Sequence, residues 1–167
     1  MEIGHIELGR HGQVEVTSGF LNIGEASGIP IIESLLEIAE RSAAAHVIID
    51  CPPGSACSVV ESVKEADLCL IVAEPTRFGA HNFEMVAELV QVLGKRCAVI
   101  VNKASDENAL IDDLCAERGL PVLAHIPYSA ETARAGAAGF VAVEAEPALG
   151  EVFSGLWREI LKGGAGA

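Results

Sequence analysis

Four short apolar runs limit this chain to a small set of folds. They are residues 46–49, 68–73, 97–101 and 121–126, each rich in Val, Ile, Leu or Cys. Continuous runs of this length are typical of strands that are buried on both faces. Helical patterns lie between them, at residues 58–66, 80–93 and 107–118. Because strand and helix alternate, the sequence predicts an α/β fold with a mostly parallel, doubly wound sheet and helices on both faces.

The two ends of the chain add smaller elements to this sheet. Alternating apolar residues around a Gly-rich turn predict a β-hairpin over residues 5–17, and helical spacing predicts a helix over 31–44. A last amphipathic helix is expected at 147–162, followed by a flexible tail at 163–167. No composition shift marks a boundary, so we expect one domain over residues 1–162.

Charge and hydropathy exclude several classes of protein. The chain has 11 Lys and Arg against 24 Asp and Glu, a net charge of −13, and no basic cluster that would bind the phosphates of a nucleic acid. No apolar run approaches the roughly 18 residues that a membrane span needs. The first residues lack a basic segment followed by an apolar one, so the sequence predicts a cytoplasmic protein without a membrane span.

The number and spacing of the cysteines and histidines predict neither a disulfide framework nor a zinc site. The cysteines number five, an odd count, and four of them lie in or beside apolar runs, where a reduced Cys behaves as a small hydrophobic residue. The histidines are scattered without the spacing of metal ligands. We therefore expect reduced thiols.

The loop after the first apolar run contains the first candidate site residues. Ligands of open α/β sheets bind at the carboxyl ends of the strands, and this loop reads Asp50-Cys51-Pro52-Pro53-Gly54. An Asp at a strand end can hold Mg²⁺ through water, and a Gly lets a backbone N–H approach a phosphate oxygen. Alternatively, Asp50 caps the following helix and the prolines end a strand. The residues alone leave both readings open.

The loops after the third and fourth runs hold weaker signals. Asn102 offers an amide donor and acceptor that suit the edge of a purine, but it is also a common turn or cap residue. Pro127 stands where the backbone can flank a flat base, or it simply ends a strand.

Taken in order, these segments are more specific than any of them alone. An apolar strand ending in D-x-P-P-G is followed by VAEPT, VIVNK and HIPYS. Over residues 12–139 this order resembles the C-terminal portion of the MinD/ParA-type P-loop ATPases, most closely the subgroup with an inserted ferredoxin-like domain. The resemblance implies a P-loop NTPase-like fold, with ATP and Mg²⁺ as cofactors of the full-length protein.

The resemblance also implies roles for single residues. Asp50 would be the Walker B carboxylate on the magnesium side, acting through water, and Gly54 would present its amide to the γ-phosphate. Pro53 belongs to the same nucleotide loop. Asn102, Pro127 and Tyr128 would contact the adenine.

One part of the family pattern is missing. A P-loop requires G-x-x-x-x-G-K-[ST], but the only Gly-Lys step is Gly94-Lys95, with Arg96 in place of the hydroxyl residue and Leu89 in place of the first glycine. The chain therefore resembles the second half of an ATPase. We expect weak ATP binding or none, and no hydrolysis, by this chain alone.

Two other functions remain open at this stage. A missing P-loop strand would expose an apolar edge beside residues 46–49, which favours a homodimer or a partner protein and allows a non-catalytic scaffold. The ferredoxin-containing subgroup also implies a role in iron–sulfur assembly, in which Cys51 and Cys57 from two chains would share a cluster. A cluster needs about four thiolates, and the sequence contains no C-x-x-C.

Overall fold

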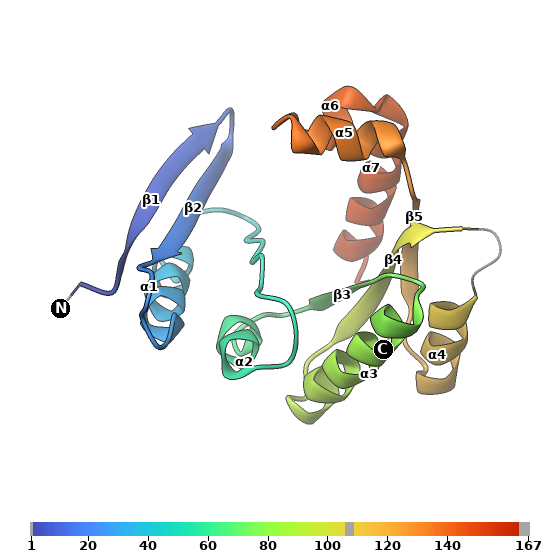
Figure 1. Cartoon of the computed structure of the whole chain (residues 1–167), viewed down its shortest axis with the longest axis horizontal. Coiled ribbons are helices and arrows are strands. Elements are labelled where there is room, and N and C mark those ends of the chain that lie inside the picture. Colours follow the sequence, from blue (N-terminus) through green and yellow to red (C-terminus); the bar gives the residue numbers. More distant parts are fainter. Residues whose placement is uncertain (1, 106–108, 164–167) are drawn as a thin grey trace. The chain divides into compact units, whose positions relative to one another are not determined.

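The computed structural model of the chain describes residues 2–105 and 109–163 (Figure 1). The chain forms two compact units, Met1–Ala66 and Asp67–Ala167. The expectation of one domain over residues 1–162 stays a prediction. Of the predicted flexible tail, only Gly163 lies among the described residues.

The first unit consists of a hairpin and two helices. Strands β1 (Gly4–His11) and β2 (Val14–Leu21) pair in antiparallel register, which confirms the predicted hairpin and extends it beyond residues 5–17. Gly12 begins the turn with a φ of +59°, a conformation that glycine adopts without strain. Helices α1 (Ile29–Glu40) and α2 (Cys57–Val63) confirm the two predicted helices in shorter form.

Helix α1 packs closely on the hairpin because two strand positions have no side chain. A Cβ atom at Gly4 would lie 2.0 Å from the backbone oxygen of Phe20 and 2.6 Å from Cδ1 of Ile31. A Cβ atom at Gly19 would lie 2.4 Å from Cγ2 of Ile31 and 3.0 Å from Cδ1 of Leu35. Ile31 is consequently buried, although a two-stranded hairpin by itself offers little core.

We expect Gly4→Ala to destabilise the first unit by about 1–3 kcal/mol, because the added methyl group overlaps backbone that cannot move freely. Gly9→Ala is the matched control, since its Cβ would approach nothing closer than the Val16 oxygen at 3.9 Å. Urea unfolding followed by circular dichroism compares the two variants. Equal unfolding midpoints would contradict the close approach of β2 and α1 to Gly4.

The strand predicted at residues 46–50 is wrong. These residues are described and take part in no ladder, and Val47, Ile48 and Ile49 are 51%, 83% and 36% exposed. An extended apolar segment becomes a strand by pairing with a neighbour, and no strand in the described part of the chain pairs with this one. The apolar run therefore stays irregular and exposed.

The second unit is built on a three-stranded parallel sheet. Its strands are β3 (Cys69–Ala73), β4 (Cys97–Ala104) and β5 (Val122–Pro127), in the order β3-β4-β5. In the central strand, residues 98–101 are at most 6% exposed, as the continuous apolar run predicts. The predicted α/β class, with a parallel sheet and an N-terminal hairpin, is confirmed.

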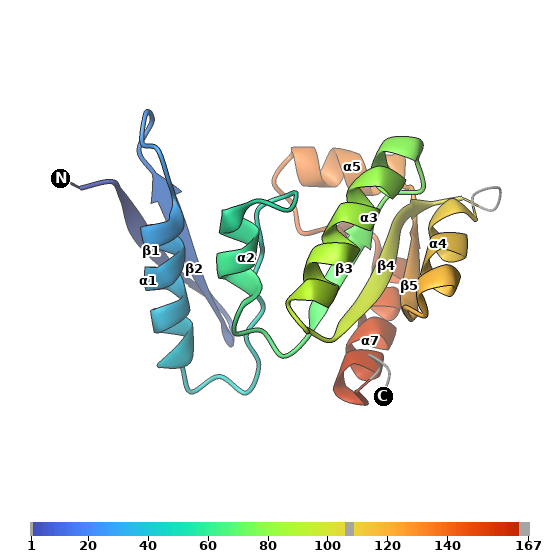
Figure 2. The same cartoon turned by 90° about the horizontal axis from the view of Figure 1, so that it is seen from below.

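Helices cover both faces of this sheet (Figure 2). Helices α3 (Arg77–Val92) and α4 (Leu110–Arg118) lie on one face, and α7 (Pro147–Leu161) lies on the other. The predicted helix 107–118 is confirmed from residue 110; residues 107 and 108 lie outside the described part. Helices α5 (Ala130–Ala137) and α6 (Ala142–Ala145) were not predicted.

Local signals fix where the helices of the second unit begin and end. The Thr76 hydroxyl accepts a hydrogen bond of 2.9 Å from the Gly79 N–H and so caps the start of α3. Gly119 ends α4 in the left-handed region with a φ of +64°, as its position before Pro121 predicts. Over the described residues, the helices are too short or too polar to cross a membrane.

Candidate functional site

The carboxyl ends of β4 and β5 bring three of the predicted site residues to one edge of the sheet. Asn102 lies opposite Ile126 in the ladder, and Ala104 lies opposite Pro127. Tyr128 follows directly and is 63% exposed. Asn102 is half-buried, whereas Pro127 is exposed. The parallel topology therefore places an amide, a proline and an accessible phenol ring on neighbouring segments.

The backbone at the end of β4 is unusual. Lys103 has a φ of +54°, and it is the one non-glycine residue with a positive φ in the described part of the chain. Its backbone N–H donates a 3.0 Å hydrogen bond to Oδ1 of Asn102. This contact holds the side-chain amide of Asn102 in one orientation. Strained residues of this kind persist where surrounding contacts hold them, often at functional sites.

An ion pair connects Lys103 to the end of the neighbouring strand β3. Lys103 Nζ lies 2.6 Å from Oε1 of Glu74, the residue that follows β3. Both side chains are about half exposed, at 51% and 42%, so the pair contributes no more than about 1 kcal/mol to stability. Its effect is geometric, because it joins the carboxyl ends of β3 and β4 beside Asn102.

The segment after Tyr128 is held by a second set of polar contacts. The Ser129 hydroxyl accepts a hydrogen bond of 3.1 Å from the Thr132 N–H and caps α5. The Thr132 hydroxyl donates to Glu146, which precedes α7. This bond, followed by one from Ser129, lowers the pKa of Glu146 below its usual value. The carboxylate is therefore the form that ties the start of α5 to the start of α7.

The other predicted residues lie in the first unit, on the loop before α2. Asp50, Pro53 and Gly54 are exposed there. Gly54 has a φ of +94°, and no atom lies within 4 Å of the position that a Cβ would take. The backbone at Gly54 is thus open to a ligand, and its conformation favours glycine.

The two cysteines of this loop are thiols and are not joined in a disulfide. Cys57 is exposed at the start of α2, and Cys51 is half-buried, with its thiol 3.8 Å from the Ile49 oxygen. In residues 2–105 and 109–163, no group of three or more His, Cys, Asp or Glu side chains is placed to hold a metal ion. A cluster shared between two chains through Cys51 and Cys57 stays a prediction.

The Gly94-Lys95 step ends a helix. Gly94 has a φ of +65° and its N–H donates to the Gln91 oxygen, while the Lys95 N–H donates to the Val90 oxygen. These are the contacts of a helix C-terminus. A P-loop instead precedes the N-terminus of a helix, so this step does not form one.

Three residues with possible roles were missed from the sequence. Glu74 follows one buried apolar run and Lys103 follows the next, and the two side chains carry opposite charges. This pattern could have predicted their ion pair. For His125, no partner was predicted from the sequence. Its Nε2 lies 2.9 and 3.1 Å from the carboxylate oxygens of Asp112 on α4. No spacing rule relates these two residues, because the contact depends on how α4 packs on the sheet.

Burial makes the thiols of the second unit weak acids. It raises the pKa of Cys69 and Cys97, and it raises the pKa of Cys115 to about 11, with a smaller contribution from the charge of Asp112. Because the thiolate is the reactive form, these side chains act as small hydrophobic residues.

We expect iodoacetamide at about pH 8 to label Cys57 first and Cys115 at least roughly 100-fold more slowly, because little thiolate forms below a pKa of about 11 and the side chain is only 1% exposed. The rate at Cys115 should rise with pH until that pKa is approached. Mass spectrometry of timed samples measures both rates. Labelling of the two thiols at similar rates in the folded chain would contradict this environment.

Comparison with solved structures identifies the fold. The chain superposes on the cell division ATPase MinD of Pyrococcus furiosus with a TM-score of 0.74 and 21% identity, covering 94% of this chain and 69% of that one. The chain has a MinD-like ATPase fold. The MinD cell division protein of Aquifex aeolicus gives a TM-score of 0.67 at 20% identity, over 80% of this chain and 61% of that one. The sequence-based resemblance is thereby confirmed at the level of the fold.

Proteins of Methanocaldococcus jannaschii are similar in sequence. Uncharacterized protein MJ0578 is 31% identical over 90 residues, which are 54% of this chain and 33% of that protein. Uncharacterized ATP-binding protein MJ0823 is 36% identical over 88 residues, which are 51% of this chain and 34% of that protein. The chain thus spans about a third of the length of the curated relatives it matches. No family model matches it.

Proposed function

We propose that this chain is the base-binding and Walker B portion of a MinD-like ATPase. The observation that carries the proposal is the convergence of Asn102, Pro127 and Tyr128 at the carboxyl edge of a parallel sheet with the MinD-like fold. Nucleotides bind at this edge in open α/β sheets. The similarity to a protein named as ATP-binding supports the same assignment.

On the base side, Asn102 is the residue that selects the ligand. Its Oδ1 already accepts the Lys103 N–H, so Nδ2 is the part of the amide left to donate to a ring nitrogen of adenine. Tyr128 and Pro127 are exposed and supply flat apolar surface beside the base. Glu74 acts on Asn102 only indirectly, through its ion pair with Lys103.

On the phosphate side, the proposed residues belong to the loop of the first unit. Asp50 would hold Mg²⁺ through water, since a hard cation prefers carboxylate oxygens. The open backbone of Gly54, with its φ of +94°, fits a donor to a γ-phosphate oxygen, and Pro53 restricts the loop beside it. Magnesium neutralises charge on the phosphates when it is bound.

ATP hydrolysis is proposed only for a protein that also contains a P-loop. The P-loop provides the Lys and the backbone amides that hold the β- and γ-phosphates. Of such contacts, the residues described above offer only the proposed backbone amide of Gly54. For the chain alone we expect Mg-ATP to bind no tighter than about 100 µM, because several charge-assisted hydrogen bonds are missing.

An interaction role is the second candidate. β3 ends the sheet, and on one face its Leu70 and Val72 are 37% and 60% exposed. An edge strand with exposed apolar side chains favours pairing with another strand, from a second copy or from a partner protein. Absence of any Mg-ATP contact at Asn102 would favour this scaffold function over the ATPase.

Asn102→Asp tests the proposed base contact. We expect about tenfold weaker nucleotide binding, because the carboxylate can still accept the Lys103 N–H but cannot donate to a ring nitrogen. Gln91→Glu makes the same amide-to-acid change at an exposed position of α3 and serves as the control. Titration of AMP, followed by NMR, compares the two variants. Equal affinities would remove Asn102 from the site.

A further inference from the structure

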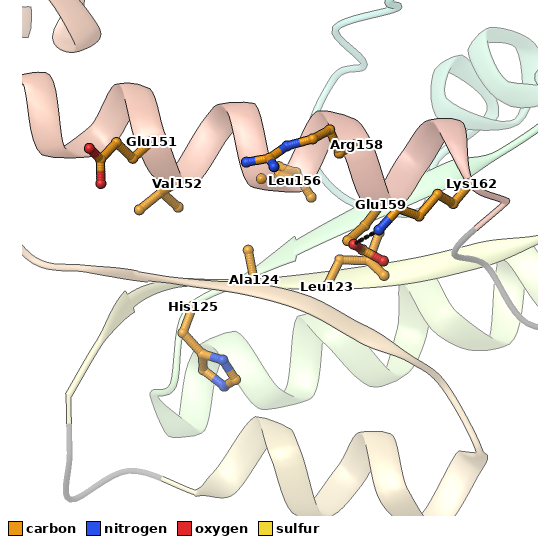
Figure 3. A pocket seen from close by; sticks show the side chains of 10 residues that line it. Leu123, Ala124, His125, Glu151, Val152, Leu156, Arg158, Glu159 and Lys162 are labelled. Atoms are coloured by element: carbon orange, nitrogen blue, oxygen red, sulfur yellow. Dashed lines mark hydrogen bonds and ion pairs between the residues drawn. The ribbon is translucent and has the colours of Figure 1, made fainter.

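The second unit contains a groove that the proposed nucleotide site does not use. It lies between β5 and α7 and has a volume of about 420 Å³ (Figure 3). One wall is formed by three consecutive residues of β5. The other is one face of α7. Leu123, Ala124 and His125 line it from β5, and Val152, Gly155 and Leu156 line it from the middle of α7.

The strand wall of the groove is an open sheet edge. β5 pairs with β4 on one side only, and no strand among the described residues pairs with its other side. Unpaired N–H and C=O groups along such an edge form a template for a further strand. The His125 side chain does not fill the space, because it points away from α7, toward Asp112 on α4 (Figure 3).

The helix wall offers an apolar floor with spare room. Val152 and Leu156 lie on the side of α7 that faces β5, and Ala124 projects toward them from the strand (Figure 3). Gly155 adds to the room, because a Cβ there would meet nothing within 4 Å. A medium-sized apolar side chain therefore fits beside these residues.

The two ends of the groove differ in charge. Glu151 lies toward the first turn of α7, while Arg158 and Lys162 lie toward its last turns (Figure 3). Glu159 pairs with Lys162 at 2.8 Å. Arg158 uses its Nε to donate to the Ser154 oxygen at 3.1 Å, which leaves the other guanidinium N–H groups able to form a bidentate contact. That end of the groove therefore suits a carboxylate.

We propose that this groove binds an extended peptide, which adds to β5 as a further strand. The segment places an apolar side chain between Val152 and Leu156, an acidic side chain beside Arg158 and a basic one toward Glu151. Main-chain bonds to the strand edge supply affinity, and the side-chain contacts supply selectivity. The proposal is independent of the nucleotide site, because Asn102, Pro127 and Tyr128 do not line the groove.

Fluorescence anisotropy with two labelled, end-capped pentapeptides tests the proposal. Their sequences are Lys-Thr-Val-Thr-Glu and its reverse, because the strand can add in either direction. We expect one of them to bind with a Kd below about 500 µM. Replacing its Glu by Gln should weaken binding several-fold in the unaltered chain, and this difference should vanish in Arg158→Gln. A failure of both peptides to bind by about 1 mM would overturn the proposal.

Two glycine variants keep the test specific to the groove. Gly155→Leu adds a side chain at a position where a Cβ meets nothing within 4 Å, so it occupies part of the groove and should weaken binding by at least about tenfold. Gly150→Leu is the matched control, since it also lies on α7 with nothing within 4 Å of its Cβ and does not line the groove. Equal peptide affinities of the two variants would refute the site. Conversion of a dimer to a monomer by Gly155→Leu alone would instead assign the groove to a second copy of the chain and overturn the peptide proposal.

Discussion

Asp50→Asn should reduce ATP hydrolysis by at least about 100-fold in a protein that joins this chain to a functional P-loop segment, because the change removes the charge that holds hydrated Mg²⁺. Stability should change by less than about 0.5 kcal/mol, since Asp50 is exposed in a loop and Asn is nearly the same shape. Steady-state phosphate release and thermal melting of the same preparation give both values.

The opposite reading of Asp50 makes a different prediction for the same variant. If the residue only shapes the turn before α2, Asn serves equally well, and neither hydrolysis nor melting temperature changes. Asp67→Asn provides a control, because it is another exposed Asp outside the proposed loop. Hydrolysis by Asp50→Asn at the rate of this control would discard the Walker B assignment.

Phe83→Ala should destabilise the second unit by about 3–5 kcal/mol and lower its melting temperature by more than roughly 10 °C. Phe83 is 2% exposed, on the face of α3 that packs toward the sheet, so its removal leaves a cavity in the core. Phe78→Ala on the same helix is the matched control, since Phe78 is 76% exposed. Its cost should stay within about 0.5 kcal/mol.

Chemical denaturation of these two variants, with a tryptophan signal from Trp157, separates core burial from helix propensity. Both variants place the same residue type on α3, so propensity changes equally in each. Similar unfolding free energies for Phe83→Ala and Phe78→Ala would contradict the packing of α3 on β3.

The second unit could be predicted well because its strands have their partners within the chain. The runs that became β3, β4 and β5 lie next to one another in the sheet, so burial and pairing agree with the sequence pattern. The run 46–49 has the same apolar pattern, yet it is exposed and irregular. A strand forms only when a second segment pairs with it, and the sequence of the run itself does not show whether such a partner exists. Helices α5 and α6 are short and rich in Ala and Gly, without an apolar period to mark them.

The candidate site was predictable in position but not in its internal contacts. The rule that ligands bind at strand carboxyl ends places Asn102 and Pro127 together, and the ladder register confirms their proximity. The contact between Lys103 and Glu74 depends on the left-handed backbone at residue 103 and on how two side chains meet across strands. The spacing of residues along the sequence predicts neither this backbone conformation nor this contact.

An NMR titration of the isotopically labelled chain with Mg-ATP, up to about 10 mM, tests the central claim most directly, because it detects weak binding and locates it. The proposal predicts shifts of the amide signals of residues 102–104 and 127–129, with a Kd of about 100 µM or weaker. Unchanged signals at these residues over the whole titration would contradict a base-binding role for the carboxyl edge of β4 and β5. A sub-micromolar Kd would contradict the expectation that this chain, which lacks the P-loop motif, binds Mg-ATP only weakly.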